Sequence, residues 1–156
     1  MRLRVRDLVN ADASLISRRC WSDARVYALE KRGIFAKSWL FLGHESQIRS
    51  PGDFVQAYMC ETPIILSRGL DGAFYANVNS CTHRGLPVCR ADHGNTKRFV
   101  CPYHNWSYSV EGNLQTIPQE SEVLHKPDKS QLGLKRVPRV EVWRGLIFGS
   151  FNESII

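Results

Sequence analysis

The sequence predicts a small, mainly β protein: an antiparallel β sandwich or barrel preceded by one helix. Two observations carry this prediction. From residue 39 onward, short segments rich in β-branched and aromatic residues alternate with turn residues. The segment before them is rich in helix-forming residues instead. Several short strands at such spacing are typical of a sandwich or barrel.

The helix is expected near the N-terminus. Residues 1–20 are polar and irregular, so we expect an extended arm or a short helix there. Ser22 and Asp23 are residue types that cap helices, and strong helix formers follow in DARVYALEKR. Gly33 suits the position just after a helix. The sequence therefore predicts a helix over about residues 23–32.

The expected strands are WLFLGH (39–44), FVQAYMC (54–60), PIILSR (63–68), AFYANVN (73–79), RFVC (98–101), WSYSV (106–110) and a pair within EVWRGLIFGSF (141–151). Turn chemistry separates many of them, at residues 50–53, 70–72, 93–95 and 111–113. The polar stretch from about 117 to 133, with Pro118 and Pro127, is expected to be a long loop.

The composition is that of an ordinary globular protein of one domain, with 43% hydrophobic and 23% charged residues among 156. The net charge of +6 is scattered along the chain, and no nucleic-acid motif accompanies it. No apolar run approaches the roughly 20 residues of a membrane span, and the N-terminus lacks the apolar core of a secretory signal. We therefore expect a cytoplasmic protein with no nucleic-acid or membrane partner.

The five cysteines do not suggest a disulfide framework, because their number is odd and no secretory signal precedes them. Only Cys81 and Cys101 stand beside histidines at ligand spacing. Cys20, Cys60 and Cys89 are expected to be small buried hydrophobic residues.

Two segments carry candidate metal ligands. Cys81-Thr82-His83-Arg84-Gly85 has the pattern C-x-H, and Cys101-Pro102-Tyr103-His104-Asn105-Trp106 has C-x2-H. The chain between them contains a turn and a strand, enough to go out and return as a hairpin. The sequence therefore predicts two ligand loops, 81–86 and 101–106, that meet at one end of a β structure.

Two thiolates and two imidazoles suit either one tetrahedral zinc ion or a [2Fe–2S] cluster with cysteines on one iron and histidines on the other. Zinc fingers usually group like ligands, whereas each loop here mixes one Cys with one His. This mixing favours the iron–sulfur cluster. Incidental core residues are a poor explanation, because all four candidate ligands lie in two short loops beside Gly85 or Pro102.

CTHRG and CPYHNWSY resemble the Rieske [2Fe–2S] domain in the large (α) subunit of bacterial aromatic-ring-hydroxylating dioxygenases. GIFAKSWLFLGHESQIRSPGDF and VEVWRGLIFGSF are similar to other parts of that domain, so the resemblance covers most of residues 23–151. It implies a Rieske-type antiparallel β sandwich with a cluster-binding subdomain. The expected organisation is an N-terminal arm and helix over 1–35 and a Rieske domain over 36–156.

The resemblance also implies residue roles. Cys81 and Cys101 would bind the buried iron, and His83 and His104 the iron nearer solvent. Trp106 would cover the cluster, while Arg84 and Tyr103 would lie around the ligands. Asn105 stands where many relatives have Gly, and asparagine tolerates a left-handed backbone well.

The Rieske proteins of cytochrome bc-type complexes differ, because they carry an extra Cys in each loop that forms a bridging disulfide. Leu86 and Tyr103 stand at those places here, so no such bridge is possible. The bc-type proteins also place a Ser hydroxyl near the cluster, where this chain has Trp106. We therefore expect a reduction potential in the lower half of the Rieske range of roughly −150 to +300 mV.

The dioxygenase α subunits also contain a catalytic domain with a mononuclear non-haem iron(II) held by a facial triad. No D-x2-H-x4-H arrangement occurs here, and His44, His93 and His125 are expected to be ordinary histidines. We therefore expect that domain to be absent and the chain alone not to be catalytic. The implied role is to take electrons from a ferredoxin or flavin reductase and pass them to the mononuclear iron.

The implied assembly is a trimer of α subunits with β subunits, acting in aromatic hydrocarbon catabolism. Two alternatives remain at this point. A free-standing Rieske ferredoxin is disfavoured because such ferredoxins lack the region over 23–52. A structural zinc module is the second alternative.

Overall fold

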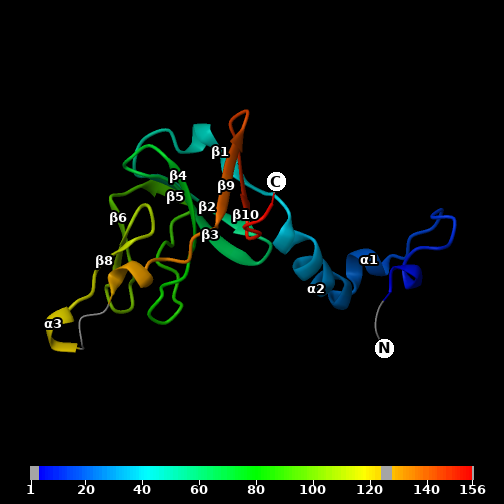
Figure 1. The fold of residues 1–156 in the computed structure, drawn as a ribbon, viewed down its shortest axis with the longest axis horizontal. Helices are drawn as coiled ribbons and strands as arrows, with labels where there is room; N and C mark the ends of the chain where they lie inside the picture. The colour runs from blue at the N-terminus through cyan, green and yellow to red at the C-terminus, as the bar shows by residue number, and fades with distance from the viewer. Residues whose placement is uncertain (1–3, 124–127, 156) are drawn as a thin grey trace.

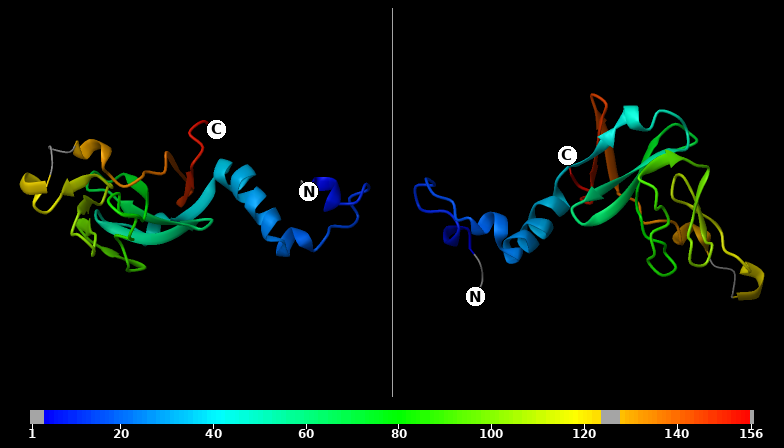
Figure 2. Two further views of the ribbon diagram at one scale, coloured as in Figure 1. Left: turned by 90° about the horizontal axis from the view of Figure 1, so that it is seen from below. Right: turned by 180° about the vertical axis from the view of Figure 1, so that it is seen from behind.

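The computed structural model describes residues 4–123 and 128–155. It has two parts: a β body and a helical arm at the N-terminal end that projects away from the body (Figure 1). The two further views show the same separation (Figure 2). None of the described helices is long and apolar enough to cross a membrane.

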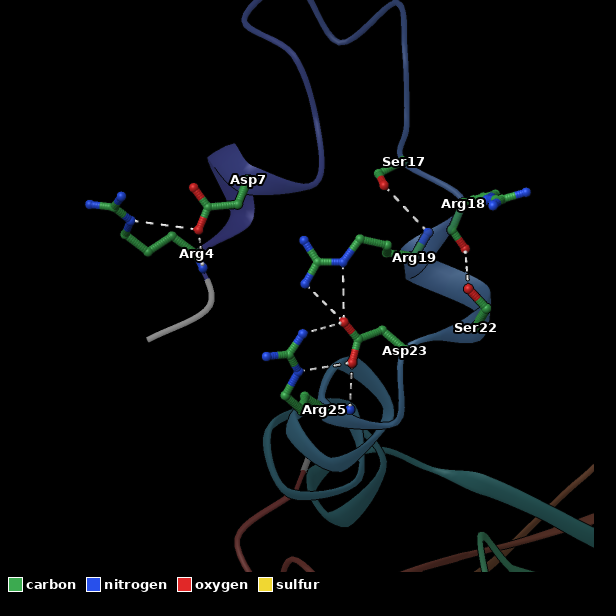
Figure 3. A network of polar contacts seen from close by, with 8 residues as sticks. All are labelled: Arg4, Asp7, Ser17, Arg18, Arg19, Ser22, Asp23 and Arg25. Atoms are coloured by element: carbon green, nitrogen blue, oxygen red, sulfur yellow. Dashed lines mark hydrogen bonds and ion pairs between the residues drawn. The ribbon is translucent and has the colours of Figure 1, made fainter. Parts of the chain in front are cut away.

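Within residues 4–37, the arm contains four helical segments: η1 (Val5–Asp7), α1 (Arg19–Ser22), α2 (Ala24–Gly33) and η2 (Phe35–Lys37). Asp23 caps α2 as predicted, because its carboxylate accepts a hydrogen bond from the Arg25 backbone N–H at 3.0 Å. The guanidinium groups of Arg19 and Arg25 bind the same carboxylate (Figure 3). A salt bridge of 2.7 Å between Lys31 and Glu61 ties the arm to the β body.

The predicted helix over 23–32 is confirmed to within a residue, but Gly33 does not follow the helix. It is the last helical residue, because the N–H of Ile34 still bonds to the carbonyl of Glu30 and the chain continues directly into η2.

In the part of the chain that the structure describes, the β body contains three antiparallel sheets. The first has the order β4-β3-β2-β5, built from β2 (Asp53–Met59), β3 (Thr62–Arg68), β4 (Phe74–Val78) and β5 (His93–Asn95). The second has the order β1-β10-β9, from β1 (Leu40–His44), β9 (Arg139–Trp143) and β10 (Leu146–Ser150). The third has the order β6-β7-β8, from β6 (Arg98–Val100), β7 (Ser107–Ser109) and β8 (Leu114–Thr116). The mainly antiparallel β fold with an N-terminal helix is therefore confirmed.

The prediction of a turn at His93-Gly94-Asn95 was wrong, because these residues form β5 and pair with β2. Tertiary contacts impose the extended backbone. A Cβ on Gly94 would lie 3.2 Å from the ring of Phe54, so a larger residue would have to displace that ring by a few tenths of an ångström. Asn95 donates hydrogen bonds to the Pro51 carbonyl and the Asp53 carboxylate.

The stretch over 117–133 is not wholly irregular. It contains two short helical turns, α3 (Glu120–Val123) and η4 (Lys129–Gln131), and Asp128 caps the second through the N–H of Ser130. Strand β8, just before it, was not predicted. Among the three structural cysteines, only Cys89 is buried as expected; Cys20 and Cys60 are partly exposed.

Two hydrophobic clusters fill the β body. One lies between the first two sheets and includes Leu42, Ile64 and Ile147. The other contains Cys81 and Cys101 together with Phe99, Tyr108 and Val110. The two predicted ligand loops therefore sit directly on a packed core.

Candidate metal centre

The two ligand loops close in the same way. In the first, the N–H of Cys81 donates to the carbonyl of Leu86 at 2.8 Å, and the N–H of Gly85 donates to the carbonyl of Cys81 at 2.7 Å. In the second, Cys101 bonds to Trp106 and Asn105 to Cys101, each at 2.9 Å, with the same donors and acceptors. Both loops therefore place a cysteine at the first residue of a six-residue closed turn.

The fifth residue of each loop has a left-handed backbone. Gly85 has a φ of 79° and Asn105 has a φ of 58°. Glycine adopts this conformation freely, and asparagine tolerates it better than most residues. The expectation that Asn105 keeps the loop intact is confirmed.

The four candidate ligands are arranged by depth. Cys81 and Cys101 are 3% and 2% exposed, whereas His83 is exposed and His104 partly so. The two imidazole rings lie side by side, with centroids 4.6 Å apart. The structure therefore brings both histidines together on the solvent side of two buried thiols.

The other three predicted site residues surround the imidazoles. The ring of Trp106 stacks on His83 at 4.9 Å with an interplanar angle of 9°. Tyr103 stacks on His104 at 3.8 Å, and the Arg84 guanidinium lies 5.9 Å from the Tyr103 ring. Each histidine thus has its own aromatic neighbour, which restricts ring rotation and covers part of the site.

One buried atom tests whether these residues suit a metal cluster. Nδ1 of His104 is buried and has no hydrogen-bond partner in the part of the chain that the structure describes. A buried polar atom without a partner is costly and calls for an explanation, such as a bound ion. An imidazole nitrogen that binds iron needs no hydrogen bond. The donor set therefore fits a cluster held by these loops.

His83 is also suited to metal binding. Although the side chain is exposed overall, partial desolvation of its ring is the main cause that lowers the pKa of His83, and the neighbouring His104 and Arg84 lower it further. A neutral imidazole is the form that binds metal. Over the described residues, no three His, Cys, Asp or Glu side chains are grouped so as to hold a single metal ion.

Two residues near the ligands were missed by the sequence reasoning. Tyr108 is fully buried, and its hydroxyl lies 3.1 Å from Sγ of Cys81. Thr82 contacts the same hydroxyl through both its N–H and its side chain. The only sequence signal was the strand alternation in WSYSV, which places Tyr108 in a strand without naming its partner.

A third residue missed by the sequence reasoning supports the first loop. The Oδ1 atom of buried Asn79 accepts hydrogen bonds from the N–H groups of Val88 and Cys89, and its Nδ2 donates to the Cys89 carbonyl. Asn79 thereby joins the two ends of the segment that contains loop 81–86.

Two of the remaining histidines, His44 and His93, lie in strands outside the ligand loops. His44 ends β1 as predicted, and its Nδ1 accepts a hydrogen bond from the N–H of Ser46. His93 lies in β5, and His125 is outside the described residues.

Comparison with known protein families matches residues 38–138 to the Rieske [2Fe–2S] domain. The chain belongs to this family. The Rieske match spans both ligand loops, and it replaces the zinc alternative with a [2Fe–2S] cofactor.

Relatives of this Rieske domain include the α subunit of benzene 1,2-dioxygenase from Pseudomonas putida, 43% identical over 152 residues. The match covers 96% of this chain and 33% of the relative. The large oxygenase component of the naphthalene 1,2-dioxygenase system of Pseudomonas aeruginosa is 45% identical over 133 residues, which are 85% of this chain and 30% of the relative. The chain therefore spans about a third of the length of these relatives.

Solved structures give the same result. A naphthalene 1,2-dioxygenase variant bound to phenanthrene superposes with a TM-score of 0.90 at 39% identity, covering 96% of this chain and 34% of that one. A quaternary ammonium Rieske monooxygenase in complex with L-carnitine superposes with a TM-score of 0.80 at 28% identity, covering 88% and 39%. Because the first match includes the arm as well as the Rieske domain, it favours a piece of an oxygenase subunit over a free ferredoxin.

Proposed function

We propose that Cys81, His83, Cys101 and His104 ligate a [2Fe–2S] cluster and that this chain is the electron-accepting domain of an aromatic-ring-hydroxylating dioxygenase α subunit. The observation that carries the proposal is the meeting of two Cys/His loops over buried thiols, with an unpartnered Nδ1 on His104. The names of the relatives support the dioxygenase assignment. When bound, such a cluster accepts and releases one electron at a time.

The buried and the exposed ligands would have different roles in this electron transfer. Cys81 and Cys101 would hold one iron in the core, where low dielectric and packed side chains exclude water. His83 and His104 would hold the other iron at the surface. The exposed edge of His83 would then be the shortest route for an electron from a docked partner, while Trp106 and Tyr103 shield the flanks.

The wider organisation is part of the same proposal. Residues 1–35 form an arm and residues 36–156 the Rieske domain, and the mononuclear iron lies in a catalytic domain outside this chain. A ferredoxin or flavin reductase supplies the electrons, and neighbouring α subunits of a trimer, with β subunits, complete the enzyme in the cytoplasm. All five cysteines are free, which suits a reducing compartment.

Visible absorption and EPR of the purified chain, before and after dithionite, test this proposal. We expect a red-brown protein whose reduced form gives the EPR spectrum of a cluster with mixed Cys and His ligation. His83→Cys and His104→Cys should each change that spectrum to an all-thiolate type or abolish it. A colourless, EPR-silent protein with stoichiometric zinc, or variants with an unchanged spectrum, would contradict the ligand assignment.

A further inference from the structure

The hydroxyl group of Tyr108 lies at the centre of a small polar network at the edge of the core. It is 3.1 Å from Sγ of Cys81 and 3.0 Å from Oγ1 of Thr82, and it accepts a hydrogen bond from the N–H of Thr82 at 3.2 Å. Tyr108 is fully buried, so water does not reach its hydroxyl, whereas Thr82 is exposed. The hydroxyl has one hydrogen and two acceptors within reach.

The hydrogen of the Thr82 hydroxyl is already committed. Oγ1 of Thr82 lies 2.7 Å from the carbonyl oxygen of Leu132, which can only accept. Thr82 therefore donates to Leu132, and its oxygen faces Tyr108 as an acceptor. The hydrogen of Tyr108 is thus contested between a hydroxyl oxygen and a sulfur at nearly equal distances.

We propose that Thr82 tunes the reduction potential of the cluster by competing with the Cys81 sulfur for the hydroxyl hydrogen of Tyr108. The inference rests on the proposed function, because it requires that Cys81 ligate the cluster. Thr82 is a positioning residue in this scheme: it acts only through Tyr108 and touches no iron.

The sign of the effect follows from charge. Reduction adds one electron to the cluster, and a hydrogen bond to a ligand sulfur stabilises the more negative state. A Tyr108 hydrogen directed at Cys81 therefore raises the potential, and one drawn toward Thr82 lowers it. No proton leaves the tyrosine, since burial, and then the neighbouring Cys81, raise the pKa of Tyr108.

The position of Thr82 is set by a distant part of the chain. Leu132 follows η4, fifty residues along the sequence from Thr82. The short bond to its carbonyl keeps the Thr82 oxygen beside Tyr108 rather than free to rotate away. The segment after η4 thereby fixes how strongly the Cys81 sulfur is hydrogen-bonded.

Redox titration of three single variants and one double variant tests the proposal. Each titration is monitored by visible absorption of the cluster-bearing protein. Thr82→Val keeps the β-branched shape but removes the competing oxygen, so its potential should rise. Tyr108→Phe removes the hydrogen, so its potential should fall. Thr82→Ser keeps both the oxygen and the bond to Leu132 and should match the unmodified protein. The rise in Thr82→Val should reach up to about a tenfold change in the reduction equilibrium, or 59 mV for one electron.

The double variant separates positioning from a general loosening of the loop. If Thr82 acts through Tyr108, adding Thr82→Val to Tyr108→Phe changes the potential no further. A potential that is unchanged or lowered in Thr82→Val, or a rise that persists in the Tyr108→Phe background, overturns the inference. Thr82→Ala, which also lacks the oxygen, replaces Thr82→Val should the latter bind no cluster. An unmodified protein without a Rieske EPR spectrum would instead overturn the proposed function.

Discussion

The two ligand loops share one local design but differ in what holds them. Loop 101–106 joins β6 to β7, and the pairing of Val100 with Ser107 closes it directly. Among the described residues, no strand pair closes the ends of loop 81–86 in this way. Its support comes from Asn79, which bonds to Val88 and Cys89, and from Thr82, which bonds to Leu132. The six-residue turn itself is therefore formed by local hydrogen bonds in both loops. The position of loop 81–86 depends in addition on side chains outside the turn.

Removal of a ligand thiol should have the largest effect on both loops. Cys81→Ser and Cys101→Ser should each lose the cluster, because the remaining three ligands leave one iron under-coordinated. Iron and sulfide content and visible absorption measure the loss. Cys89→Ser is the matched control, since Cys89 is equally buried but contributes no proposed ligand. Equal cluster content in Cys81→Ser and Cys89→Ser would contradict the assignment.

The difference in support predicts a second effect, confined to the first loop. Asn79→Ala would leave the buried N–H groups of Val88 and Cys89 without an acceptor. The expected loss is about 2–3 kcal/mol of stability, or several degrees of melting temperature. Asn113→Ala, at an exposed asparagine, is the control and should melt within about a degree of the unmodified protein. Equal melting of the two variants would show that Asn79 does not hold the loop.

The shared left-handed residue gives a smaller test. Gly85→Ala should destabilise the protein by about 1–2 kcal/mol, because alanine is strained at positive φ. An added Cβ at Gly85 meets only Ser80 Oγ at 3.7 Å, so crowding contributes little. Asn105→Gly relieves strain but increases the freedom of the unfolded chain, and should change stability by less than about 0.5 kcal/mol. Equal melting temperatures of the two variants would contradict the idea that both loops need a left-handed residue at the fifth position.

The smallest expected effect concerns Asp53 and Asn95, which join β2 to β5 in the segment between the two loops. The pKa of Asp53 is lowered by the hydrogen bond from Asn95 and then by that from the N–H of Ser50. The stabilisation is fully present above the ordinary value of 3.8 and is lost as pH falls through the lowered folded value. At pH 5–6, Asp53→Asn should lose the visible absorbance of its cluster slightly faster than the unmodified protein, because it lacks this stabilisation. The two rates should converge as the pH falls from 3.8 through the lowered folded value, and a difference that grows in acid would contradict the assigned sign.

The sequence predicted the parts of the site that depend on local spacing. C-x-H and C-x2-H were sufficient to find the four candidate ligands, and residue type alone indicated the left-handed backbone at Asn105. The strand at His93–Asn95 was missed because Phe54, Pro51 and Asp53 impose it from another part of the chain. Tyr108 and Asn79 were missed for the same reason, since each acts on atoms many residues away.

The arrangement of the two loops also has a consequence for the unfolded chain. Cys81 and Cys101, once bound to one cluster, close a ring of about 20 residues, much as a disulfide would. Chain-entropy arguments assign about 3 kcal/mol to a closure of this length. The ring contains β5 and β6, and Asn95 within it bonds to Asp53 outside it. Both strands are short, so they would gain stability from this cross-link. Cofactor loading is in this sense a cross-linking step that completes the fold of this end of the molecule.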